Sequence, residues 1–371
     1  MSKNKWMTKL TKDFGKTASD LADDLKKVNV LPTRSVSLNW ATAMGGIVPG
    51  KVSIFYGPES SGKTLIAMMA VADLLKRDPD AIVVWFDAEF SFSPNMFKKL
   101  GGDLDRLVVR QSSDPVTIFD YIGGDLKEAL QEGAPIKGVV IDSIKSIRYP
   151  KDNKKVTTDM TMGGTGSAYL PSALKLIIPI INEFKLLSIF IQQVTAQIDP
   201  MKAMRNPFVI TEGHALKHAA DIMMEITRLD TKNGVVEDEH GRQIGHKIRV
   251  KVKKNRMGPP ARKAEFLFAY DSSTVEQKEK ELFDLAVSVG VIFHPKKDGR
   301  PNAMMWEGAG RTIRGEAGMV EALKDPNYFQ AILKECESFV DKREIKVDEN
   351  GVVLDSEDSD SSEESELEFL P

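Results

Sequence analysis

The octet Gly57–Thr64 combines the residue types that bind the phosphates of a nucleoside triphosphate. Its glycines let backbone N–H groups approach phosphate oxygens without a Cβ in the way. The Lys63 ammonium can reach the β- and γ-phosphates, and the Thr64 hydroxyl can bind Mg²⁺. We therefore predict a nucleotide and Mg²⁺ site in the octet and the adjoining Leu65. The octet fits the pattern G-x-x-x-x-G-K-[ST] and reads Gly57-Pro58-Glu59-Ser60-Ser61-Gly62-Lys63-Thr64.

The residues that flank the octet predict a strand before it and a helix after it. Lys51–Tyr56 has the apolar character of a buried strand. Leu65–Lys76 contains good helix formers and no Gly or Pro. The phosphates would then lie at the N-terminus of a helix, where the helix dipole favours negative charge.

Further apolar runs predict the other strands of a parallel sheet. Runs that are apolar on both faces are typical of strands covered by helices on both sides. Helical segments around 116–130 and 171–184 separate them, and alternating apolar and basic residues over Ile248–Lys253 predict antiparallel strands beyond. We thus predict an α/β fold, a parallel sheet extended by antiparallel strands. The predicted parallel strands are Ala81–Phe86, Gly138–Ile141, Leu186–Ile191 and Ile222–Ile226.

Polar residues at the carboxyl ends of these strands could supply the other groups that nucleotide hydrolysis needs. In such sheets, sites form at the carboxyl ends of strands. Asp142 could bind Mg²⁺ or its water, and either Asp87 or Glu89 could orient or deprotonate the attacking water. Gln193 could bond the γ-phosphate through its amide, although a polar residue that merely ends a strand is the alternative.

Length and composition predict one large domain with smaller appendages. The chain has 371 residues, of which 42% are hydrophobic, enough for a substantial core. Its apolar runs are too short to span a bilayer, and we see no secretory signal, so we expect a cytosolic protein. The single cysteine, Cys336, excludes an internal disulfide framework.

The acidic residues are concentrated at one end of the chain. Residues 355–371 contain eight acids and no base, and without them the net charge changes from −3 to +5. A basic body with an acidic tail is typical of nucleic-acid-binding proteins. A disordered tail that only raises solubility is the alternative.

Six motifs follow one another along the chain: GPESSGKT, FDAEF, VVIDS, IFIQQ, EGHALKHAAD and VKVKKNRMGPPARKAEF. In this order they resemble the RecA family of ATP-dependent DNA strand-exchange proteins, from about residue 36 to about residue 333. The overall divergence resembles phage recombinases of the UvsX type. The resemblance implies a RecA-type core, ATP and Mg²⁺ as cofactors, and DNA-dependent ATP hydrolysis. It implies a helical filament on single-stranded DNA that pairs with homologous duplex DNA, assisted by a single-stranded-DNA-binding protein and a loading mediator in the bacterial cytosol.

The resemblance also implies roles for individual residues. Glu89 matches the family's catalytic glutamate, in preference to Asp87. Gln193 matches the residue that links the γ-phosphate to the DNA-binding segment. Lys254 and Arg256 match two cations that reach the ATP of the neighbouring protomer.

The strand pattern offers separate support for these two cations. Ile248, Val250 and Val252 share one strand face, and Lys254 and Arg256 continue that parity. Cations that end an apolar stripe suit a subunit boundary. A solvated basic hairpin is the alternative.

Three positions depart from the family pattern. Ser93 and Met96 stand where the family's adenine pocket has an aspartate and a tyrosine. His218 replaces an aromatic interface residue of bacterial RecA, whereas the interface residue Lys217 is retained. These positions bear on adenine contacts and on coupling between subunits.

Two segments, 154–168 and 195–213, are candidate DNA-binding loops. They combine glycines, cations and apolar residues, a mixture suited to single-stranded DNA, where stacking and backbone charge dominate. Flexible connections are the alternative for both. The candidate DNA-binding residues are Met162, Gly163, Gly164, Gly166, Lys175, Lys202, Arg205, Gly213 and His214.

We divide the chain into an N-terminal polymerisation arm (1–38), an ATPase core (39–276), a small C-terminal α/β domain (277–345) and an acidic tail (346–371). The resemblance implies that the arm docks on the next protomer, and Val28–Leu31 could add there as an edge strand or by apolar packing. A head-to-tail contact that does not close produces an open filament.

Two other functions use the same core. A hexameric helicase or clock-type ATPase is one, and the cationic segment Lys254–Phe266 and the C-terminal domain argue against it. A recombination mediator that hydrolyses ATP poorly is the other, and the intact Lys63, Glu89 and Asp142 argue against it.

Overall fold

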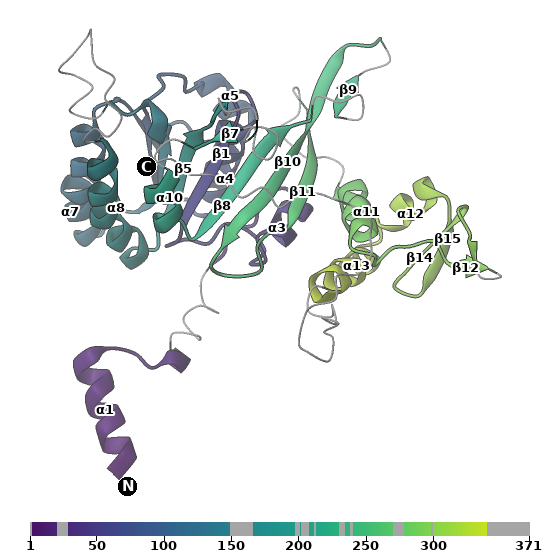
Figure 1. Cartoon of the computed structure of the whole chain (residues 1–371), viewed down its shortest axis with the longest axis horizontal. Coiled ribbons are helices and arrows are strands. Elements are labelled where there is room, and N and C mark those ends of the chain that lie inside the picture. Colours follow the sequence, from purple (N-terminus) through teal and green to yellow (C-terminus); the bar gives the residue numbers. More distant parts are fainter. Residues whose placement is uncertain are drawn as a thin grey trace.

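A nine-stranded sheet forms the centre of the computed structural model (Figure 1). Its order is β11-β10-β8-β1-β5-β4-β2-β3, and β9 pairs with β10. The α/β fold predicted from the sequence is confirmed, with parallel strands extended by antiparallel ones. The structure describes residues 2–20, 29–148, 166–196, 201, 208–210, 213–229, 234–237, 240–269, 278–297 and 300–339.

The strands have two arrangements. Six run parallel, and two long strands and a short one extend the sheet antiparallel to β8 or to each other. The parallel strands are β1 (Val52–Gly57), β2 (Ile82–Asp87), β3 (Leu107–Gln111), β4 (Ile136–Asp142), β5 (Leu187–Gln193) and β8 (Ile222–Arg228). The others are β9 (Val235–Glu237), β10 (Gln243–Asn255) and β11 (Lys263–Ala269), with a separate pair, β6 (Thr195–Ala196) and β7 (Phe208–Val209).

Helices cover both faces because successive strand residues point to opposite sides. Phe55 packs with the first group of helices, whereas Ile54 and Tyr56 pack with the second. The first group is α3 (Val36–Ala41), α4 (Lys63–Arg77) and α5 (Pro94–Lys99). The second is η1 (Val116–Asp120), α6 (Tyr121–Gly123), α7 (Asp125–Gln131), η2 (Ile144–Ser146), α8 (Gly166–Glu183) and α10 (Gly213–Ala219).

The C-terminal elements have a hydrophobic cluster of their own. Buried Glu281 fastens this part to α3 by accepting hydrogen bonds from the Ser37 N–H (2.8 Å) and hydroxyl (2.6 Å). Trp40 adds a hydrogen bond from its Nε1 to the Cys336 carbonyl (3.0 Å). The elements are α11 (Lys278–Ser288), β12 (Lys296–Lys297), β13 (Arg300–Pro301), β14 (Met305–Gly308), β15 (Arg311–Arg314), α12 (Glu316–Ala322) and α13 (Pro326–Phe339).

Several local features refine the expectations from the sequence. The helical segment expected around 116–130 is present but divided into η1, α6 and α7, and Gly124, with φ −108° and ψ −96°, separates α6 from α7. The edge strand β3 was missed. The C-terminal region holds two hairpins besides its helices. Leu31 pairs with Ile47 of its own chain and is buried, so this residue of the segment Val28–Leu31 is not available to a neighbour, and Val28 lies outside the described residues.

The N-terminal helix α1 (Ser2–Phe14) presents apolar side chains to solvent. Trp6, Met7 and Leu10 are all about half exposed or more. Among the described helices, none combines the length and apolar character that crossing a membrane requires.

Candidate ATP-binding site and distant cations

The carboxyl ends of the central parallel strands meet at one edge of the sheet. In the strand register, Gly57 lies beside Gln193 and Asp87 lies beside Asp142. Parallel pairing therefore gathers the phosphate loop, the acidic residues and the terminal amide, although they are far apart in the sequence. This convergence follows from the fold alone and needs no ligand.

The phosphate loop depends on two glycines. A Cβ on Gly57 would lie 2.0 Å from the carbonyl oxygen of Ile226, because β8 passes directly beside it. Gly62 adopts φ +97°, a left-handed conformation that side chains disfavour, just before α4 begins at Lys63. The N–H groups of the loop therefore lie at the N-terminus of α4, a fifteen-residue helix, and this position favours the binding of anions.

Lys63 lies inside the loop and not on the surface. Its ammonium donates hydrogen bonds to the carbonyls of Gly57 (3.0 Å) and Pro58 (2.5 Å). Burial lowers the pKa of Lys63, and the carboxylates of Glu89 and Asp142 oppose that shift. The lysine is therefore a desolvated cation whose favourable partner would be a phosphate group.

Thr64 and Asp142 form the pair expected to bind Mg²⁺. The Thr64 hydroxyl donates to Asp142 Oδ2 at 2.8 Å, and the carboxyl is only 2% exposed. Its other oxygen, Oδ1, has no hydrogen-bond partner among the described residues. Burial raises the pKa of Asp142 to about 7, and the charges of Glu89 and Asp87 add to the effect.

These residues fit a magnesium ion. A buried carboxylate oxygen without a partner, beside a hydroxyl, is a suitable pair of hard oxygen ligands. In the described part of the chain, no cluster of three His, Cys, Asp or Glu side chains could hold a metal by itself. Phosphate oxygens and water would complete the coordination of Mg²⁺, and the bound ion would neutralise charge on the phosphates.

The structure separates the two carboxylates that sequence reasoning could not distinguish. Asp87 is almost fully buried and accepts hydrogen bonds from the N–H groups of Ser91 (3.1 Å) and Phe92 (3.0 Å) and from Gln111 (3.0 Å). It therefore shapes the chain after β2. Glu89 is partly exposed, and its Oε1 accepts from Gln193 Nε2 at 2.8 Å. Glu89 is thus the carboxylate with access to a water molecule.

Ser93 and Met96, two positions that depart from the family pattern, both have structural contacts. Ser93 caps α5 by accepting a hydrogen bond from the N–H of Met96 at 3.3 Å. Its hydroxyl therefore has a structural partner. Met96 packs at the edge of the core, where a flexible thioether can fit against a ring without a hydrogen bond.

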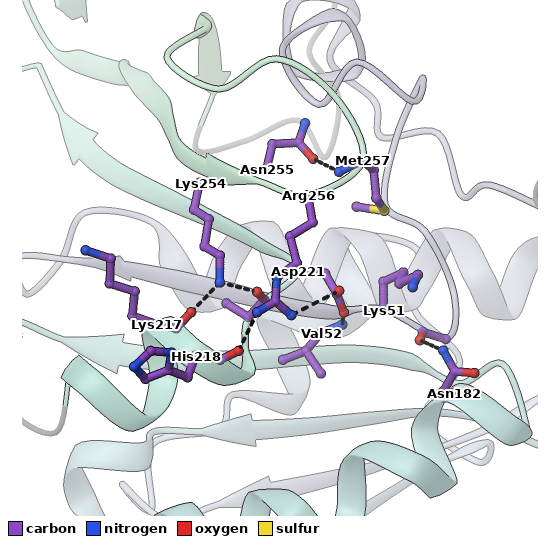
Figure 2. Close-up of polar contacts among 12 residues, drawn as sticks. Lys51, Val52, Asn182, Lys217, His218, Asp221, Lys254, Asn255, Arg256 and Met257 are labelled. Atoms are coloured by element: carbon purple, nitrogen blue, oxygen red, sulfur yellow. Dashed lines mark hydrogen bonds and ion pairs between the residues drawn. The ribbon is translucent and has the colours of Figure 1, made fainter.

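The two predicted trans cations lie side by side at the end of β10 (Figure 2). Lys254 Nζ donates to the Ala220 carbonyl at 2.7 Å and also to the Lys217 carbonyl. Arg256 Nη2 donates to the His218 carbonyl at 2.8 Å. The carbonyls at the C-terminal end of α10 thus hold both cations.

The argument from strand parity for these cations was wrong. Val252 pairs with Met224, but Lys254 pairs with the adjacent Met223, so a β-bulge interrupts the alternation. Val252 therefore packs toward α4, whereas Lys254 turns to α10 on the opposite face. The cations do not continue the apolar stripe.

The cations and the phosphate loop occupy opposite edges of the sheet. Lys254 pairs with Met223 at the amino end of β8, which runs parallel to β1. The loop follows the carboxyl end of β1. A six-residue strand spans roughly 17 Å, so these cations are too far away to contact a nucleotide in their own protomer's loop.

Comparison with known proteins gives the family. A family model of the RecA N-terminal domain matches residues 3–275. The chain is 31% identical to "Protein RecA" of Aquifex pyrophilus over 289 residues, 77% of this chain and 78% of that protein. It is 32% identical to those of Bifidobacterium breve over 79% of this chain and 70% of that protein, and of Clostridium acetobutylicum over 77% and 78%.

The chain belongs to the RecA family. Membership confirms the resemblance predicted from the six motifs. It also supports the broader part of the predicted function, a nucleotide-binding ATPase of the recombinase class that works with DNA.

The predicted DNA-contacting residues of this RecA-family chain are only partly described. Gly166 begins α8, and Lys175 lies exposed on that helix. Gly213 and His214 begin α10, and the pairing of Thr195 with Val209 joins the two ends of the second segment. The other candidates lie outside the described residues: Met162, Gly163, Gly164, Lys202 and Arg205.

Sequence reasoning missed a basic surface on the outer sheet. Arg249 and Lys251 of β10 point away from the buried face, and Lys263 of β11 lies beside Lys251. Glu225 and Glu265 are the acids among them, and the latter contacts Arg249 Nε at 2.6 Å. The basic residues that alternate with apolar ones over Ile248–Lys253 are the sequence signal that could have indicated this surface.

Proposed function

We propose that this chain is a DNA-dependent ATPase that assembles head to tail on single-stranded DNA and catalyses homologous pairing and strand exchange. The observation that carries the proposal is the separation of Lys254 and Arg256 from their own phosphate loop. Such cations can stabilise transition-state charge only on an ATP bound by another protomer. Because the two edges of one sheet are different surfaces, the contact is heterologous, and repetition produces a filament or a ring.

Within one protomer, the proposed chemistry is divided among five side chains. Lys63 binds the phosphates, and Thr64 with Asp142 holds Mg²⁺. Glu89 orients and deprotonates the attacking water, because its carboxylate is accessible and hydrogen-bonded on one side only by Gln193. Gln193 reports the γ-phosphate to the second DNA segment, which begins two residues later at Thr195.

The described surfaces support DNA as the partner. The basic surface of β10 and β11 offers Arg249, Lys251 and Lys263 to a phosphate backbone. We propose that this surface and the two loop segments contact the DNA strands, with charge contacts dominating over base reading.

We propose that α1 docks on the next protomer. Its exposed Trp6, Met7 and Leu10 form an apolar strip with no cover in the described chain. We keep the proposed division into arm, core, C-terminal domain and tail, except that the arm ends before α3, because α3 crosses the boundary at residue 38 and its Leu38 packs in the core. The separate C-terminal cluster supports the C-terminal domain. Like its bacterial relatives, the chain would act in a bacterial cytosol, whether a bacterium or a phage encodes it.

Mixing two inactive variants tests the shared site. Lys63→Arg lacks a working phosphate loop but keeps both cations. Arg256→Ala keeps a working phosphate loop but lacks one of the cations. Each alone should hydrolyse ATP poorly on single-stranded DNA. An equimolar mixture should recover about a quarter of wild-type activity, the share of interfaces that join an intact loop to intact cations. No recovery would contradict a shared site.

Electron microscopy on single-stranded DNA with a non-hydrolysable ATP analogue separates the alternatives. Open filaments support the proposal. Closed rings would favour a hexameric helicase or clock-type ATPase. Filaments with negligible hydrolysis by the wild type would favour a mediator.

A further inference from the structure

Asp221 lies between the two cations and the first strand of the sheet (Figure 2). It lies two residues after the end of α10 and directly before β8. One carboxylate oxygen, Oδ2, accepts a hydrogen bond from the Val52 N–H at 3.0 Å. The other, Oδ1, lies 3.7 Å from Arg256 Nη1. The carboxylate therefore connects the backbone of β1 to the guanidinium.

The backbone fixes Asp221 before any side chain is considered. Its N–H donates to the Val52 carbonyl at 3.0 Å, and its carbonyl accepts from the Arg256 N–H at 2.8 Å. Its side chain is 16% exposed, whereas that of Arg256 is 51% exposed. The acid is thus a rigid, largely covered anchor, and the arginine that it holds still reaches the protein surface.

Two neighbouring cations need such an anchor. Lys254 and Arg256 repel each other, and each has to be held for both to point toward one phosphate group. The carbonyls at the end of α10 supply partial negative charge. Asp221 is the full negative charge that ion-pairs with Arg256 here.

We propose that Asp221 is a positioning residue for catalysis in trans. Its carboxylate holds Arg256, and with it Lys254, in the arrangement that reaches the ATP of the next protomer. The inference rests on the trans role of these cations proposed above, and it gives a role to the last residue of the EGHALKHAAD motif, for which the resemblance implied none.

The test uses Asp221→Asn. Asparagine keeps an oxygen that can accept from Val52 N–H, but it removes the charge that faces Arg256. On single-stranded DNA we expect kcat for ATP hydrolysis to fall about five- to tenfold, with KM for ATP changed less than about twofold. Asp73→Asn is the control, because Asp73 is about as covered as Asp221 (17% against 16% exposed) and forms an ion pair with Arg34, a better-covered arginine elsewhere on the core. It should keep wild-type kcat.

Two further readouts separate positioning from a merely structural role. In the Arg256→Ala background, adding Asp221→Asn should lower kcat by less than about a further twofold, because the arginine that Asp221 positions is already absent. Mixed with Lys63→Arg, which supplies intact cations, Asp221→Asn should regain activity. Mixed with Arg256→Ala, it should not, because neither protomer then has a working pair.

The pH profile gives a third readout. Burial and the charge of Arg256 lower the pKa of Lys254, the charge of Lys217 adds to this, and Asp221 opposes it. Without Asp221, Lys254 loses its proton at a lower pH. The alkaline fall of kcat should therefore begin at lower pH in Asp221→Asn than in the wild type.

The outcomes are distinguishable. If Arg256→Ala keeps wild-type activity, the trans role itself fails. If Arg256→Ala is impaired but Asp221→Asn is not, the trans role stands and the inference about Asp221 is wrong. A loss in Asp221→Asn that multiplies in full with that of Arg256→Ala, without recovery in the Lys63→Arg mixture, also overturns the inference.

Discussion

We predict that the buried carboxyl of Asp142 lowers the stability of the fold, although ATP hydrolysis needs it. In the nucleotide-free and Mg²⁺-free protein, burial raises its pKa from 3.8 to about 7. One oxygen accepts from Thr64, and the other has no partner among the described residues. Above pH 7, the folded protein therefore holds an ionised group that would be more stable in the unfolded chain. Asp142→Asn should abolish ATP hydrolysis and yet stabilise the fold.

The size follows from the pKa. A shift from 3.8 to about 7 corresponds to about 4 kcal/mol of destabilisation once the carboxyl is ionised. The asparagine amide leaves a buried N–H₂ group without a partner, which costs about 1–3 kcal/mol. The free energy of unfolding at pH 8 should then be about 2 kcal/mol higher for Asp142→Asn than for the wild type.

The pH dependence of stability follows from the direction of the Asp142 pKa shift. A raised acid pKa means that the folded state binds more protons than the unfolded state between pH 4 and pH 7. This group therefore lowers wild-type stability as pH rises through that window. At pH 4, where the carboxyl is neutral, the advantage of asparagine should disappear and reverse.

Urea unfolding of both proteins at pH 4 and pH 8, without nucleotide or Mg²⁺, measures the difference. Asp87→Asn is the matched control. Its carboxylate accepts three hydrogen bonds, so its loss should destabilise the fold at pH 8 by about 1–3 kcal/mol. If Asp142→Asn is no more stable than the wild type at pH 8, the account of a buried, half-partnered carboxylate is refuted.

Three other predictions concern the proposed function. Glu89→Gln should lower kcat about 100-fold or more on single-stranded DNA while binding of an ATP analogue stays within about threefold; a normal kcat would exclude Glu89 as the base. Lys251→Ala should weaken DNA binding equally across sequences and reduce the salt slope by about one, and an unchanged slope would remove it from the DNA surface. Deleting residues 355–371 should speed nucleation on duplex DNA, because the tail's acids compete with DNA for basic surfaces; an unchanged rate at low Mg²⁺ would contradict that competition.

The central part of the fold was predictable because its signals are local. Apolar runs such as Ala81–Phe86 and Gly138–Ile141 indicate strands that are covered on both faces. Once such strands are parallel, the residues that follow them must share an edge. The pairing of Asp87 with Asp142 and of Gly57 with Gln193 is the direct result.

The remaining features depend on tertiary contacts that the sequence pattern does not contain. The choice of Glu89 over Asp87 depends on which carboxylate the chain after β2 encloses. The direction of Lys254 depends on one bulge in β10. Asp221 ends the EGHALKHAAD motif, but the motif alone does not show what it does, because its role comes from the meeting of α10, β1 and β10 in space.

In the proposed assembly, the second candidate DNA-binding segment, residues 195–213, connects two different ATP sites. It begins after Gln193, which contacts Glu89 in the protomer's own site. It ends at α10, whose carbonyls hold the cations that would serve the next protomer's ATP. Because β6 and β7 join the two ends of the segment, DNA bound there can influence both connections together. In the proposed assembly, hydrolysis that depends on DNA and assembly that depends on ATP would then share one structural link, the β6–β7 pairing that lies between Gln193 and α10 in the sequence.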